Sequence, residues 1–149
     1  MAEGPNFRDT EHMYKVFDYI LSHLMSDPEF GPKLASMKLI VQWVYTDPDG
    51  VITFNLKDPP REGYFGDWAV GPTEWKPDVT TYQTSTFGLA FLQGRENPMI
   101  AVTRGKVKAK GNIVALMKFM PTGKPMARLV RQYLRDMGEE NLVIPKKKK

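Results

Sequence analysis

The spacing of apolar residues along the chain predicts two long helices. Six apolar residues between 13 and 24 recur three or four positions apart, which places them on one face of a helix. Asp9 or Thr10 is suited to cap the start of that helix. Residues 126–137 repeat the spacing, and Gly138 is typical of a residue that ends a helix. We therefore expect amphipathic helices that begin near residue 10 and near residue 126.

Shorter helices are indicated by capping residues, prolines and glycines. Asp27-Pro28 and Asn97-Pro98 each pair a capping residue with a proline suited to the first helical position. Gly94 and Gly105 are natural stops for the apolar stretches that precede them. The expected short helices cover residues 27–36, 84–94, 97–105 and 113–120.

Five other stretches have the composition of β-strands. The turn signal Asp47-Pro48-Asp49-Gly50 joins the first two, so we expect them to form an antiparallel hairpin. In the last stretch, lysines alternate with Val107 and Ala109, which predicts a half-buried strand whose lysines face water. The expected strands cover residues 38–45, 51–56, 64–70, 79–84 and 106–110.

The order of these elements predicts an α+β fold with a mainly antiparallel sheet that helices cover on one face. Strands and helices do not alternate strictly, which argues against a doubly wound parallel sheet. The length of 149 residues suits one domain. We expect that domain to span residues 1–145 and to be followed by a basic, disordered tail over residues 146–149.

Composition excludes several classes of protein. The chain has no cysteine, so disulfides, thiolate metal sites and thiol nucleophiles are absent. No apolar run approaches the ~20 residues of a membrane span, and the first residues lack the pattern of a signal peptide. These features lead us to expect a cytoplasmic protein.

The charge is distributed unevenly. The formal net charge of +4 equals the charge of the four lysines at 146–149. Residues 1–103 carry 8 basic and 14 acidic side chains, whereas residues 104–145 carry 9 and 3. The basic part either docks on the acidic part or attracts an anionic partner such as a membrane surface. The lysines near residue 108 are not interleaved with stacking aromatics, so we do not expect nucleic-acid binding.

Residues typical of catalytic or metal sites are few. His12 and His23 are the only histidines, and on one helix they lie about 16 Å apart, too far to share a metal ion. Nucleophile-elbow and phosphate-loop patterns are absent. We expect no enzyme, no catalytic residue, no metal and no cofactor. Enzymatic activity would require carboxylates that converge in a pocket.

The chain is unusually rich in methionine and aromatic residues. It has nine methionines, and 11% of its residues are aromatic. Methionine is flexible and suits surfaces that accommodate variable apolar shapes, although it also fills gaps in ordinary cores. The later helices have more apolar surface than a small sheet can cover. We therefore expect a cavity of the kind that apolar ligands need.

Residues 92–112 read LQGRENPMIAVTRGKVKAKGN, and this stretch resembles the sterol carrier protein-2 (SCP2-like) family. In that family an apolar helix precedes a glycine, an Asn-Pro or similar pair and a short helix, and a Gly-Lys-hydrophobic-Lys strand and an apolar helix follow. The strands at 51–56 and 77–84 are also similar to the family's strands. The matching positions are Phe91, Leu92, Gly94, Asn97, Pro98, Ala101, Gly105, Lys106, Val107, Lys108, Gly111, Asn112, Leu116 and Met117.

The resemblance implies a sheet of about five strands and helices that enclose an apolar tunnel. On this basis we interpret the chain as a non-enzymatic carrier of a fatty acid, an acyl-CoA, an isoprenoid or a sterol. The residues that we expect to bind the ligand are Trp43, Phe54, Phe87, Phe91, Met99, Ile100, Val107, Leu116, Met117, Met120, Met126, Val130 and Tyr133.

The expected partner is thus a lipid or another apolar small molecule, with an anionic membrane surface and a second copy of the chain as further candidates. The alternative hypothesis is an accessory module. In that case the same apolar surface forms a homodimer or docks on an enzyme.

Overall fold

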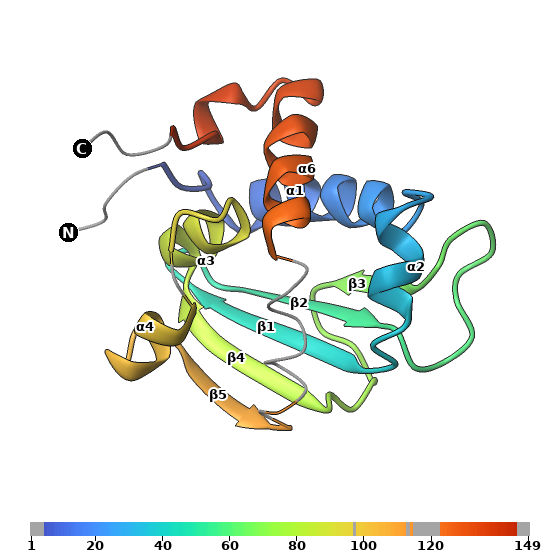
Figure 1. Cartoon of the computed structure of the whole chain (residues 1–149). Helices are drawn as coiled ribbons and strands as arrows, with labels where there is room; N and C mark the ends of the chain where they lie inside the picture. Colours follow the sequence, from blue (N-terminus) through green and yellow to red (C-terminus); the bar gives the residue numbers. More distant parts are fainter. Residues whose placement is uncertain (1–4, 97, 113, 115–122, 146–149) are drawn as a thin grey trace.

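The computed structural model of the chain describes residues 5–96, 98–112, 114 and 123–145 (Figure 1). It contains a five-stranded sheet and helices that lie on one side of it. The elements are α1 (Thr10–Leu24), α2 (Phe30–Ala35), β1 (Ile40–Thr46), β2 (Gly50–Asn55), β3 (Asp67–Val70), β4 (Val79–Thr84), α3 (Ser85–Leu92), α4 (Pro98–Thr103), β5 (Lys108–Gly111), α6 (Gly123–Asp136) and the 3₁₀ turn η2 (Glu140–Leu142).

The sheet confirms the predicted α+β class and adds a parallel pair. The strand order is β3-β2-β1-β4-β5, and all neighbouring strands are antiparallel except β1 and β4. The predicted hairpin of β1 and β2 is confirmed. β4 lies parallel to β1 because the chain returns from β3, at one edge, to the far side of β1 through residues 71–78.

Helix α1 forms where the apolar spacing predicts it. Asp9 caps the helix, because its carboxylate accepts a hydrogen bond from the backbone N–H of His12 at 2.8 Å. The apolar stripe from Met13 to Leu24 is buried. Contacts with β2 and β3 place this stripe on the sheet, and α6 packs beside it.

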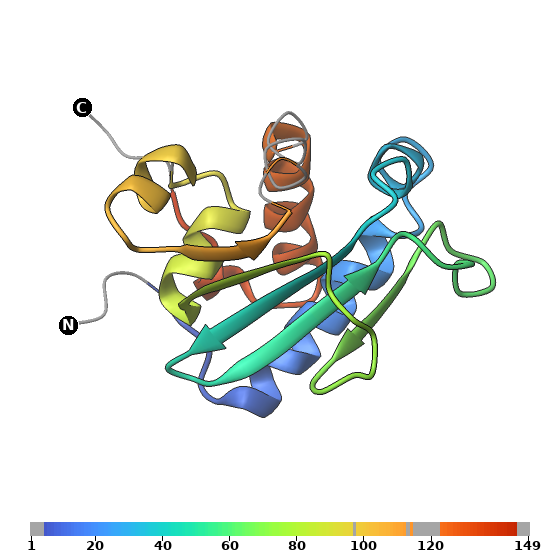
Figure 2. The same cartoon turned by 90° about the horizontal axis from the view of Figure 1, so that it is seen from below.

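The two faces of the sheet differ in chemistry because side chains alternate along each strand. On the face towards the helices, Trp43 of β1 lies beside Ile52 of β2, and both are buried. On the other face, Tyr82 of β4 lies beside Lys108 of β5, and both are exposed. Figure 2 views the molecule with the strands in front of α1. We call the helix-covered side the inner face and the opposite side the outer face.

Some element boundaries differ from the prediction. Strand β3 begins at Asp67 instead of residue 64, because Phe65 donates a backbone hydrogen bond to Met25 at 2.7 Å and holds the preceding turn against the end of α1. Strand β5 begins at Lys108 instead of residue 106, because the Lys106 N–H donates a hydrogen bond to the Ala101 carbonyl in the turn after α4.

The ends of two helices also differ from the prediction. Helix α2 begins at Phe30, and Asp27 caps the turn before it by accepting a hydrogen bond from the Phe30 N–H. Helix α6 begins at Gly123, three residues earlier than predicted. The helix predicted over residues 113–120 lies outside the described residues, apart from residue 114. No described helix is both long and apolar enough to cross a bilayer.

Candidate functional site

The predicted ligand residues from the sheet lie in the centre of the core. Trp43 and Phe54 are 5% and 1% exposed, and their rings meet edge to face at 4.9 Å. Phe17 of α1 packs on Trp43 with ring centroids 6.1 Å apart. Trp43 and Phe54 therefore form a floor of the sheet beneath the helices, and the ring of Phe17 covers part of that floor.

The predicted residues from α6 are buried against α1. Met126, Val130 and Tyr133 all belong to the core cluster. The Tyr133 ring lies 5.2 Å from the ring of His23. Burial is the main cause that raises the pKa of the Tyr133 phenol to about 12. This part of α6 fills the space beside α1, and its apolar side chains join the same core as the sheet floor.

A second group of predicted residues is only partly covered. Phe87 and Phe91 of α3 are half-buried and stack on each other at 6.4 Å. Ile100 of α4 is 50% exposed, and Val107 is half-buried just before β5. We call these four residues the apolar rim. Figure 1 shows that α3, α4 and β5 are neighbours at one end of the sheet.

The remaining predicted ligand residues have side chains outside the described part of the structure. Met99 lies in α4, and only its backbone is described. Leu116, Met117 and Met120 lie outside the described residues. The structure therefore divides the placed residues into a core group on β1, β2 and α6 and a rim group on α3, α4 and the start of β5.

Two polar residues of the inner face were missed from the sequence. Tyr45 of β1 is buried and lies opposite Gln83 of β4. Burial is the main cause that raises the pKa of the Tyr45 phenol, and the neighbouring Gln83 amide acts in the other direction. The Oε1 atom of Gln83 is buried, and it has no hydrogen-bond partner in the described structure. The available signal in the sequence was a polar residue at an inward-facing position of each strand, Tyr45 in β1 and Gln83 in β4.

Both described histidines have structural partners. The Nδ1 atom of His12 accepts a hydrogen bond from the Arg8 N–H at 3.1 Å, so its Nε2–H donates to Glu139 at 2.9 Å. This pair ties α1 to the segment after α6. His23 stacks on Tyr19 at 4.1 Å. Among the described residues, no three His, Asp or Glu side chains are grouped so that they can hold a metal ion.

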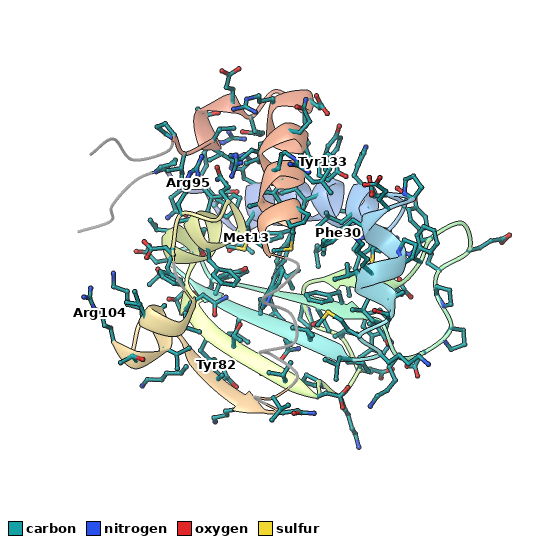
Figure 3. All side chains as sticks on the ribbon, in the orientation of Figure 1. Met13, Phe30, Tyr82, Arg95, Arg104 and Tyr133 are labelled. Carbon is teal, nitrogen blue, oxygen red and sulfur yellow. The ribbon has the colours of Figure 1, made fainter. Side chains whose placement is uncertain are left out.

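Arginines gather where α3 meets α6. Arg128, Arg131 and Arg135 share one face of α6, and Arg95 follows α3. Burial is the main cause that lowers the pKa of the Arg131 guanidinium, and the charges of Arg95, Arg135 and Arg128 lower it further. The ion pairs of the described residues include none of these four side chains, which we call the arginine cluster. In Figure 3, Arg95 lies on the helix side of the sheet, far from Arg104 and Tyr82.

Comparison with known proteins identifies the fold. The model of the SCP-2 sterol transfer family matches residues 17–124. The sterol carrier protein domain 2 of Helicoverpa armigera is similar with a TM-score of 0.60 and 24% identity, over 85% of this chain and 95% of that one. Sterol carrier protein 2 from Yarrowia lipolytica, in its apo form, is similar with a TM-score of 0.55 and 16% identity, over 89% of this chain and 96% of that one.

A third solved structure with the same fold is the UbiJ-SCP2 ubiquinone synthesis protein, with a TM-score of 0.55 and 12% identity over 81% of this chain and 95% of that one. No curated protein matches the sequence. At these identities the solved structures establish the fold, and the family match covers it from within α1 to the start of α6. The chain belongs to the SCP-2 sterol transfer family, a family of lipid-binding domains.

Proposed function

We propose that the chain is a non-enzymatic, cytoplasmic carrier that holds an elongated apolar ligand in a tunnel between the inner face and the helices. The candidate ligands are a fatty acid, an acyl-CoA, an isoprenoid or a sterol. The observation that carries this proposal is the apolar rim, whose side chains remain partly open to solvent although α3 packs on β1, a strand that holds the buried floor. The family match supports the same role.

The hydrophobic effect is sufficient for this kind of binding. Each CH₂ group removed from water contributes about 0.8 kcal/mol. Shortening an acyl chain by two carbons should therefore weaken binding by about 1.6 kcal/mol, which is somewhat more than tenfold. A carrier that encloses the chain shows this dependence on length, whereas a surface that touches only the head group does not.

The test is a titration of delipidated protein with a fluorescent fatty acid, followed by competition with unlabelled acyl, prenyl and sterol compounds. Saturable binding of one ligand per chain is expected. Phe91→Ser should weaken it, because Phe91 lies on the apolar rim, and the control Phe65→Ser should not, because Phe65 lies in the loop before β3. The proposal fails if no probe of any class binds saturably.

An anionic membrane surface is the proposed site of loading, and the arginine cluster is the part of the molecule that suits it. Arginines without carboxylate partners attract lipid phosphates. Binding to vesicles that contain phosphatidylserine should weaken as salt rises. Replacing Arg128 and Arg135 by Gln should reduce binding, and replacing Lys108 and Lys110 of the outer face should not. Equal losses would exclude the cluster as the docking site.

One feature favours the alternative, an accessory module that dimerises or docks on an enzyme. Ile100 and Val102 of α4 are 50% and 44% exposed, and exposed apolar side chains suit a protein interface. A lipid-free dimer in light scattering that Ile100→Glu converts to a monomer would support this function. A monomer that binds lipid would exclude it.

A further inference from the structure

The inner face carries one polar pair among its apolar side chains. Tyr45 of β1 and Gln83 of β4 lie opposite each other in the parallel register. The Tyr45 ring stacks on Phe17 of α1 at 5.5 Å, which shows that this pair faces the helices. Gln83 is half-buried and precedes α3 by two positions, so the pair lies where the sheet floor meets the helix that carries the apolar rim.

The acceptor of this pair lacks a partner. In the described part of the chain, Gln83 Oε1 is the one buried side-chain polar atom without a hydrogen bond. A buried acceptor without a partner costs roughly 1–3 kcal/mol of stability. Such atoms are rare in native proteins and call for a specific explanation. A binding site is one such explanation, because a polar group that is unpaired in the free protein can be paired when the ligand is bound.

We propose that Tyr45 and Gln83 recognise the polar end of the ligand, and that this end is an uncharged hydroxyl group. The inference rests on the proposed carrier function and specifies the class of its ligand. The ligand hydroxyl donates its proton to Gln83 Oε1 and accepts the proton of Tyr45 Oη. One alcohol satisfies both groups, because a hydroxyl is a donor and an acceptor at once.

An ionised head group does not suit this position. The sheet residues around Tyr45 and Gln83 on the inner face are uncharged. They are Val41, Trp43, Gly50, Ile52, Phe54, Val79, Thr81 and Ala109. A carboxylate would lose its hydration there and would face the lone pairs of Gln83 Oε1, and these sheet positions supply no cation to compensate. The expected order of affinity is therefore alcohol first, then the methyl ether, then the ionised acid of equal chain length.

The experiment compares 1-hexadecanol with its methyl ether, each competing against the same fluorescent probe on delipidated protein. The ether keeps the chain and the oxygen but cannot donate a proton. The wild-type protein should bind the alcohol about tenfold more tightly, the effect of one neutral hydrogen bond. Gln83→Leu should bring the two affinities together. Tyr45→Phe should reduce the affinity for both compounds, because each accepts the phenol proton.

The sheet provides matched controls on its outer face. Gln42 and Tyr82 lie on the same two strands but on the side away from the helices, where Gln42 donates to Thr53 at 3.1 Å and Tyr82 is exposed. Gln42→Leu and Tyr82→Phe should leave the tenfold preference unchanged. A preference that these controls abolish as strongly as Gln83→Leu does would overturn the assignment.

Stability of the free protein gives a second readout that does not depend on the probe. The double variant Tyr45→Phe, Gln83→Leu removes both polar groups together, so without ligand it should melt at the wild-type temperature or above. Equal affinities of the alcohol and the ether for the wild-type protein would assign Gln83 Oε1 to an ordered water and overturn the inference while the carrier function stands. Failure of both compounds to bind would overturn the carrier function as well.

Discussion

Gly88 of α3 lies directly over the ring of Tyr45 of β1, so close that a Cβ atom on Gly88 would overlap with Tyr45 Cε1. The absence of a side chain at position 88 lets α3 approach the sheet at the point where the polar pair begins. The contact also explains why Tyr45 is only 3% exposed.

Gly88→Ala should therefore destabilise the fold by about 1–3 kcal/mol, the usual cost of an overpacked core. Urea denaturation measures the change. Gly88→Ala in a Tyr45→Leu background is the control, because the ring that the new methyl group would meet is absent there. The same cost in both backgrounds would show that the contact with Tyr45 is not the cause.

Asp78 predicts a loss of stability in acid. Partial burial acts to raise the pKa of its carboxyl, but the hydrogen bond from the Ile40 N–H and the charge of Lys57 outweigh burial, so this pKa lies below its ordinary value. A carboxylate with a lowered folded-state pKa stabilises the protein above the unfolded-state pKa of about 3.9. That contribution is lost as the pH falls through the folded-state pKa.

Denaturation of wild-type protein and Asp78→Asn between pH 7 and pH 3 measures this contribution. The wild-type protein should be the more stable at pH 7, and the difference should shrink below about pH 4. Glu62→Gln, at an exposed position in the loop before β3, should produce no such change. A difference between wild type and Asp78→Asn that is constant with pH would contradict the assignment.

Gln93 fixes the segment that follows α6. Its fully buried amide donates to Leu142 O at 2.8 Å and accepts from the Ile144 N–H at 2.7 Å. Gln93→Ala leaves one buried and one partly buried backbone group without the partner that Gln93 provides, so it should cost about 1–3 kcal/mol of stability. Hydrogen exchange should show a selective loss of protection at Ile144. Unchanged protection at that amide would contradict the role given to Gln93.

Local patterns predicted the helices and strands whose partners are near in sequence. The apolar stripe from Met13 to Leu24 and the turn before Gly50 are determined by residues close together in the sequence, and both were predicted correctly. The parallel pairing of β1 with β4 was not predicted, because it depends on where residues 71–78 return the chain and not on the strands themselves.

The candidate site was harder to predict than the fold. Apolar spacing marks Trp43 and Phe91 in the same way, yet the first is packed among core rings and the second lies half-buried on α3. Whether a position is filled by the protein or left for a ligand depends on packing, which the pattern does not contain. The role proposed for Gln83 was missed because it depends on the residue opposite it across the sheet.

The most direct test of the carrier function is native mass spectrometry of the protein as purified and after exposure to a total lipid extract. A carrier should show an added mass that corresponds to a single apolar molecule per chain, and 1-hexadecanol should displace this molecule. Protein that remains at the mass of the bare chain in both samples would contradict the carrier function.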